Sequence, residues 1–176
     1  MKHAGVLPIF VVAVLSVTTT TASAAPPHAA TIQAHCNEMQ SKVLSGDVEG
    51  ALTYVFPRLV KLIGGPEKMT SYLREGAATV HKMGATLTCS APTQYSQAGS
   101  RSFALLLVLL SSEVVDAARA KNHFKQSSSM LAISEDHGAT WLFMAITDQG
   151  VPDLLIPGGI GKLHIPPKDP GAWTRD

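Results

Sequence analysis

The stretch Ser134-Glu135-Asp136-His137-Gly138-Ala139-Thr140-Trp141 decides how the second half of this chain folds. It separates two apolar runs, which predicts the turn of a β-hairpin. Asp136 is a short acceptor that can hydrogen-bond backbone N–H groups a residue or two ahead, and Gly138 can adopt the positive φ of a tight reversal. Thr140 and Trp141 then open a strand whose indole ring can cover the turn.

The two strands of this predicted hairpin are 123–133 and 140–146, and next to the turn, at 130–133 and 141–146, they are apolar at odd and even positions alike. If one face of the sheet met water, every second residue of these strands would be polar. We therefore expect the second face to be covered. Three covers are open: the proline- and glycine-rich tail at 151–176, a second subunit in a homodimer, or a bound apolar molecule.

Two further strands are predicted upstream of the hairpin. Ala85 to Cys89 alternates in the way of a half-buried strand. Phe103 to Leu110 is an unbroken apolar run that periodicity cannot assign, and serines flank it at strand length, which favours a strand. The alternative is a leucine- and alanine-rich helix that continues to Ala120.

The chain before these strands has helical periodicity. From 29 to 44 the apolar residues share one face of a helix, and polar residues fall elsewhere. The apolar face comprises Ile32, Cys36, Met39 and Val43, whereas Gln33, Glu38 and Gln40 lie outside it.

Turn and cap residues divide the next segment. Asp47 is a predicted N-cap for a second helix that runs through Val55, and Pro57 breaks that helix. Pro66 suits the first position of a third helix, which ends at Gly84. Helices followed by an antiparallel meander predict an α+β domain with helices packed on one face of the sheet, spanning 31–150.

Residues 1–24 predict a signal peptide. A basic start, Met1-Lys2-His3, precedes an apolar stretch and the small residues Ala22-Ser23-Ala24 that a signal peptidase accepts. The apolar stretch is shorter than the roughly 20 residues needed to cross a bilayer. We therefore expect a periplasmic or secreted protein that begins at Ala25, with 25–30 as a flexible leader.

The charges of the predicted mature chain balance. The sequence has 14 basic and 13 acidic residues, and the predicted signal contains one lysine and no acid. A net charge near zero gives no electrostatic reason to expect nucleic acid as a partner. No later apolar run approaches membrane-spanning length, so no membrane partner is expected after signal cleavage.

Two cysteines remain, Cys36 and Cys89. In an oxidising compartment they have one pairing available, and such a disulfide would close a long loop. The alternative is a pair of buried free thiols. Because the required Cα separation cannot be read from the sequence, both alternatives stay open.

The order of these elements resembles the NTF2-like (SnoaL-like) superfamily in its small exported bacterial form. The resemblance rests on Ser45-Gly46-Asp47, on 56–60, on 64–69 and on the hairpin at 131–141. It implies a cone, in which a strongly curved antiparallel sheet wraps around the helices and leaves an apolar cavity at its open end. Members use that cavity for isomerisation, cyclisation, dehydration or ligand binding, or serve as dimerisation modules.

The motif S-x-D-x-G-x-T-W by itself is similar to the Asp-box, a hairpin known from sialidases and from unrelated secreted folds. A sialidase propeller would need this unit several times at a regular period. It occurs once here, so a glycosidase is not expected.

The resemblance predicts an exported, non-enzymatic binder of a small apolar ligand or of a protein partner. Tyr54 falls on the helix that lines the cavity in similar proteins, and Arg58 lies one turn further on. The candidate ligand-binding residues are Tyr54, Arg58, Met39 and Trp141. The alternative is a ketosteroid-isomerase-like or SnoaL-like enzyme that uses Tyr54 with a histidine or carboxylate in the cavity.

No catalytic residue, metal ligand or cofactor is assigned from the sequence. A His–Asp pair would suit the enzyme alternative, but no spacing marks a pair among the candidates. These candidates are His35, His81 and His123, with Asp47 or Asp116. The histidines also lack the spacing of a metal site.

Overall fold

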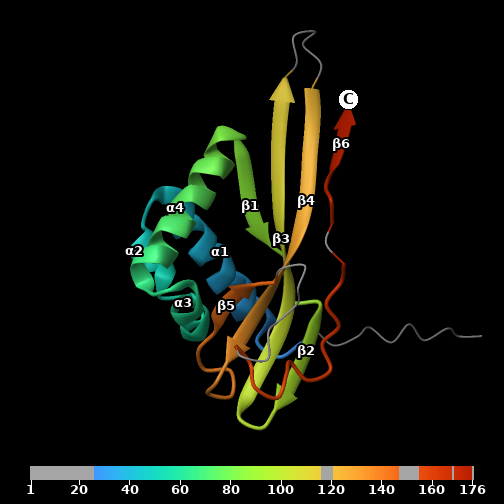
Figure 1. Ribbon diagram of the computed structural model, residues 1–176. Helices are drawn as coiled ribbons and strands as arrows, with labels where there is room; N and C mark the ends of the chain where they lie inside the picture. The colour runs from blue at the N-terminus through green and yellow to red at the C-terminus, as the bar shows by residue number, and fades with distance from the viewer. Residues whose placement is uncertain (1–25, 116–120, 147–154, 168, 176) are drawn as a thin grey trace, which may run out of the picture.

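A computed structural model describes residues 26–115, 121–146, 155–167 and 169–175, so the predicted signal peptide and Asp116 lie outside the described residues. In the described part, helices precede an antiparallel sheet that curls strongly into a half-barrel (Figure 1). This confirms the predicted α+β class. The helices are α1 (Ala29–Ser45), α2 (Val48–Leu52), α3 (Pro57–Ile63) and α4 (Pro66–Lys82). The strands are β1 (Ala85–Cys89), β2 (Gln94–Ala98), β3 (Arg101–Val115), β4 (Lys121–Ser134), β5 (Leu142–Ala145) and β6 (Ala172–Arg175).

The long strands β3 and β4 form the axis of the sheet. They pair from Ser102↔Ser134 to Val115↔Lys121. On its other side, away from β4, β3 pairs with β2 near one end and with β1 near the other. On its side away from β3, β4 pairs with β5 at residues 130–133 and with β6 at residues 122–125. The helices all lie on one side of this sheet (Figure 1).

The predicted helices are present, with shifted ends. Asp47 caps α2 as predicted, because its Oδ1 accepts a hydrogen bond of 3.0 Å from the Gly50 N–H. The helix is short and ends at Leu52 rather than at Val55. α1 begins at Ala29, inside the predicted leader. None of the helices in the described ranges combines the length and apolar composition of a membrane span.

The strand predictions are also confirmed. Ala85 to Cys89 is β1, and Phe103 to Leu110 lies within β3. The helical alternative for that run is wrong, because residues 102–115 pair one by one with β4. β2 was not predicted. Its sequence is mostly polar and lacks an alternating pattern, and it is a strand because the edge of β3 offers it hydrogen-bond partners.

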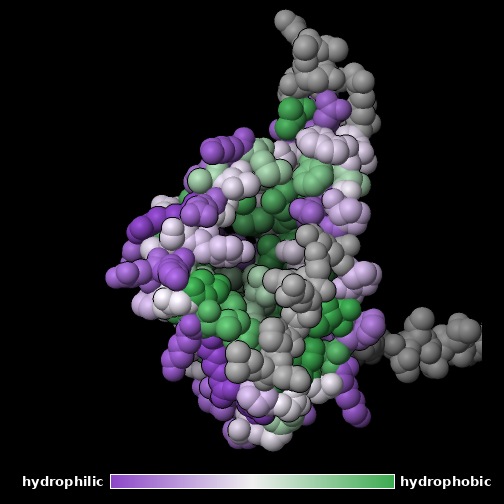
Figure 2. Space-filling view, viewed as in Figure 1, coloured by the Kyte–Doolittle hydropathy of each residue, from purple (hydrophilic) through white to green (hydrophobic). Residues whose placement is uncertain are grey.

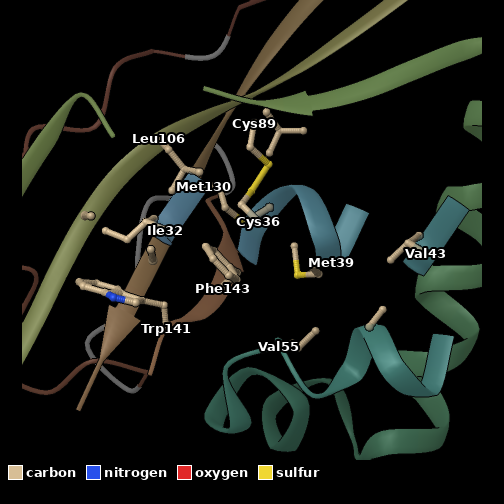
Figure 3. Packing of buried hydrophobic residues seen from close by; sticks show 14 of the residues in the cluster. Ile32, Cys36, Met39, Val43, Val55, Cys89, Leu106, Met130, Trp141 and Phe143 are labelled. Atoms are coloured by element: carbon tan, nitrogen blue, oxygen red, sulfur yellow. A yellow bond between two sulfur atoms is a disulfide. The ribbon is translucent and has the colours of Figure 1, made fainter. Parts of the chain in front are cut away.

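Alternate residues of β3 face opposite sides of the sheet. The even-numbered residues Ala104, Leu106 and Val108 join the core on the concave side, together with α1 residues such as Ile32 (Figure 3). This core is the reason why the amphipathic helices fold onto the sheet, since their apolar faces are removed from water there.

The convex side of the sheet is covered by the tail. Leu155 and Ile156 are buried against Phe103, Leu131 and Ile133 in a second apolar cluster. The tail thus provides one of the three covers considered for the two-sided apolar strands. Because both faces of the sheet are packed here, the residues that face either side of these strands are apolar.

Hydrogen bonds between the sheet and the tail hold the tail in place. The Gln94 amide both donates to the His164 carbonyl, at 2.7 Å, and accepts from the His164 N–H, at 2.8 Å. Further along, the Asp169 carboxylate accepts from the backbone N–H of Ser127 at 2.9 Å. These bonds fix the tail although little of it is regular secondary structure.

A disulfide joins Cys36 of α1 to Cys89 of β1, with a Cα–Cα distance of 6.1 Å (Figure 3). Both cysteines are buried. Two α1 side chains support the same junction: the Gln33 amide donates to the Cys89 carbonyl at 2.9 Å, and Asn37 Oδ1 accepts from the Cys89 N–H at 2.8 Å. Of the two cysteine states considered from the sequence, the structure has the bridge.

Candidate apolar ligand site

A cavity of about 280 Å³ lies between the helices and the concave face of the sheet. Its walls come from α1, the α2–α3 link, α3, α4, β1, β4 and β5. Figure 2 shows apolar side chains gathered at a hollow between the helical side and the sheet. The volume is close to the lower end of the range for small-molecule sites, about 300–1,000 Å³.

The middle of α4 leaves this space open. Met69 and Val80, near its two ends, are buried. Between them, Gly76 and Ala77 line the cavity with little or no side chain. A Cβ added at Gly76 would meet no atom within 4 Å. Gly76 and Ala77 therefore leave open a space that larger side chains at these positions would occupy.

The floor of the cavity is the core side of the sheet. Phe143 of β5 is 1% exposed and lines the cavity together with Met39 and Val55, and Figure 3 shows all three as members of the packed cluster. Backbone hydrogen bonds attach β5 to the segment after α2: Phe143 N–H donates to the Tyr54 carbonyl at 2.7 Å, and Phe56 N–H donates to the Phe143 carbonyl at 2.9 Å. The helical and sheet walls are thus directly connected.

Two lining residues carry polar side-chain atoms. Tyr72 is 63% exposed and lies at the outer side of α4. Gln40 is 8% exposed, so the prediction that it falls outside the buried face of α1 is wrong. The reason is that Gln40 lies one turn after Cys36, and α1 is packed between the sheet and the neighbouring helices, which widens its buried face. The spacing of four from Cys36 was the signal that could have indicated this.

The four predicted ligand-binding residues do not come together. Met39 lines the cavity, whereas Tyr54, Arg58 and Trp141 are not among its lining residues. An Arg58 guanidinium nitrogen lies 3.5 Å from the Leu155 carbonyl oxygen of the tail. Trp141 is 2% exposed, and its indole N–H has no hydrogen-bond partner among the described residues.

Tyr54 is directed to a polar cluster on α1. A hydrogen bond with Glu38, together with partial burial, raises the pKa of the Tyr54 hydroxyl above its ordinary value. The ring of His35 is 6.0 Å from the Tyr54 ring in an edge-to-face arrangement. Neither Glu38 nor His35 lines the cavity, so this cluster and the cavity are separate features.

The remaining histidine candidates, His81 and His123, do not line the cavity. His81 is exposed in the last turn of α4, and His123 lies on the outer part of β4, with its Nδ1 3.9 Å from a Glu113 carboxylate oxygen. The structure therefore assembles no histidine–carboxylate pair inside the cavity from the described candidates.

The predicted turn holds the hairpin that supplies Phe143. Thr140 donates from its hydroxyl, at 2.6 Å, and from its backbone N–H, at 2.9 Å, to the Asp136 carboxylate. Ser134 Oγ donates to the same carboxylate at 2.7 Å and accepts from the Gly138 N–H at 2.7 Å. Asp136 thus bonds four residues ahead rather than one or two. Gly138 has the predicted positive φ, +96°.

The same contacts make the turn sensitive to acid. The hydrogen bonds from Thr140, followed by that from Ser134, hold the pKa of Asp136 well below its ordinary value of 3.8. A depressed pKa means that the ionised carboxylate stabilises the folded state. This stabilisation is fully present above pH 3.8 and is lost as the pH falls below that value toward the folded pKa.

We expect Asp136→Ala to lower the melting temperature at neutral pH and to matter progressively less in acid. Melting curves of wild type and variant, recorded between about pH 6 and about pH 2, measure this difference. Glu135→Ala, at the exposed neighbouring position, is the control and should show no such convergence. A difference that stays constant down to the lowest pH would contradict the role of the Asp136 charge.

Comparison with known proteins finds no matching family model, no matching curated protein and no matching solved structure. The NTF2-like relationship therefore stays a prediction from the sequence, and the functional argument rests on the cavity itself.

Proposed function

We propose that this protein is an exported NTF2-like binder of a small apolar ligand, which it holds in the cavity between the helices and the sheet. The observation that carries the proposal is the composition of the cavity wall, which is apolar apart from Gln40 and Tyr72. Burial of apolar ligand surface provides the driving force for binding in such a site. The disulfide between α1 and β1 joins two of the wall elements and suits an oxidising compartment.

The wall composition favours binding over catalysis. General acid–base chemistry needs a titratable group within hydrogen-bond reach of the reacting atom. The described lining residues include no aspartate, glutamate, histidine, lysine or arginine, and the titratable phenol among them, Tyr72, is 63% exposed. The isomerase-like alternative would require Tyr54 to act from this cavity, and Tyr54 instead meets Glu38 on α1.

The proposal predicts that Gly76→Phe blocks the cavity. A phenylalanine at this lining position would fill open space without a backbone clash, because α4 has ordinary helical geometry there. Glycine is the poorer helix former, so the substitution should leave α4 intact. We expect binding of the apolar fluorescent probe N-phenylnaphthylamine to weaken by about tenfold or more, equivalent to at least about 1.4 kcal/mol.

The matched control is Ala78→Phe, two residues away on the exposed side of α4 and outside the cavity lining. It adds the same ring to the same helix and should bind the probe like wild type. Equal probe binding by wild type and Gly76→Phe would contradict the proposed site. Native mass spectrometry of the purified exported protein would also reveal a retained ligand by its added mass.

A further inference from the structure

Gln40 has a polar side chain in an apolar wall. It lies on α1, is 8% exposed and lines the cavity between Met39 and Val43. The amide has no hydrogen-bond partner among the described residues, and its atoms remain accessible, since Trp141 Nε1 is the enclosed side-chain polar atom that lacks a partner in that part of the chain. An accessible amide on the wall of a cavity can hydrogen-bond a molecule that enters the cavity.

Another glutamine on the same helix shows what a structural role looks like. Gln33 donates to the Cys89 carbonyl at 2.9 Å and so joins α1 to β1. Gln40 makes no comparable contact with the described residues, so its amide contributes no hydrogen bond to the junction of α1 with its neighbours. Packing of α1 therefore does not account for a glutamine at this position.

The chemistry of the wall defines what would satisfy this amide. A primary amide offers two N–H donors and one carbonyl acceptor, so it can bind either a carbonyl or a hydroxyl oxygen. Among the described lining residues there is no charged side chain. Because burial of an unpaired charge is strongly unfavourable, an ionised ligand does not suit the cavity.

We infer that the ligand is a neutral, largely apolar molecule with one carbonyl or hydroxyl oxygen, and that the Gln40 amide hydrogen-bonds this oxygen. The inference rests on the proposed function and adds the ligand class to it. In the ligand-free protein, water can hydrogen-bond the amide, and the ligand oxygen takes the place of that water.

The test compares two small molecules with the same fused-ring skeleton, α-tetralone and tetralin, which differ by one carbonyl group. Calorimetric titration of the intact, disulfide-bonded protein gives their dissociation constants. We expect Gln40→Met to weaken α-tetralone binding by about tenfold and to leave tetralin binding unchanged or tighter. The control is Gln97→Met, at an exposed position of β2 outside the cavity lining, and should change neither.

The outcomes separate the inference from the proposed function. If wild type binds both molecules and Gln40→Met changes neither dissociation constant, the assignment of Gln40 is wrong and the apolar site stands. If wild type binds neither molecule, the proposed function itself fails.

A second measurement keeps the test valid if the variant binds poorly for structural reasons. Without ligand, Gln40→Met should melt no lower than wild type, because it removes no hydrogen bond between described residues. Gln33→Met should melt lower, since it loses the bond to Cys89. A melting temperature for Gln40→Met as low as that of Gln33→Met would show a structural role and overturn the inference.

Discussion

Replacement of both Cys36 and Cys89 by alanine is expected to lower the free energy of unfolding by about 4 kcal/mol. The two bridged cysteines are 53 positions apart in the sequence, so the bridge closes a long loop. In the chain-entropy model, a crosslink of this length removes many conformations from the unfolded state. Both cysteines are also buried, so the double variant loses packing at the α1–β1 junction as well.

Urea unfolding of the oxidised wild type and of the double variant measures this loss. A reductant should destabilise wild type to a similar extent and leave the double variant unaffected, which controls for the substitutions themselves. A loss below about 1 kcal/mol would mean that the hydrogen bonds of Gln33 and Asn37 to Cys89 hold the junction without the bridge.

The disulfide also has a consequence for the cavity. Met39 and Gln40 follow Cys36 by about one helical turn, and Leu87 precedes Cys89 on β1. The bridge therefore fixes two walls of the proposed site, α1 and β1, relative to each other. We attribute to it both overall stability and the preorganisation of the cavity, which reduces the entropic cost of ligand binding.

Phe143→Ala is expected to cost about 3–5 kcal/mol of stability. The ring is 1% exposed and belongs both to the concave core and to the cavity wall. Its removal forfeits apolar burial and merges a new void with the existing cavity of about 280 Å³. The backbone bonds of Phe143 to Tyr54 and Phe56 do not involve the side chain and are retained.

The comparison for this prediction is Tyr72→Ala, which removes an aromatic ring from the same cavity wall at a position that is 63% exposed. We expect it to change stability by no more than about 0.5 kcal/mol. Chemical denaturation of both variants provides the measurement. A loss below about 1.5 kcal/mol for Phe143→Ala would mean that the cavity collapses around the missing ring and is not a rigid site.

Several parts of the fold were predictable because their causes are local. The stretch from Ser134 to Trp141 forms its turn through its own side chains, since Asp136 bonds Ser134 and Thr140 and Gly138 accepts a positive φ. Pro66 similarly marks the start of α4 within its own first turn. In each case the interacting groups lie a few residues apart, so a short window of sequence contains them.

Other features were missed because their causes are distant in sequence. β2 is a strand through its pairing with β3, and nothing in its own composition indicates this. Gln40 was placed on the polar side of α1, although it is buried against segments that come later in the chain. Of the candidate ligand residues, the sequence indicated Met39 but not Gly76, whose significance depends on the space beside it.

By itself, the sequence determined the α+β class, the placement of the helices before the strands, the hairpin turn and the need for a cover over the second apolar face. Only the tertiary structure decided that the tail supplies a cover, that Cys36 and Cys89 lie close enough to bridge, and that a cavity remains beneath α4. The reason is physical. Periodicity and turn chemistry act between neighbouring residues, whereas a disulfide distance or a void depends on how far apart whole elements pack.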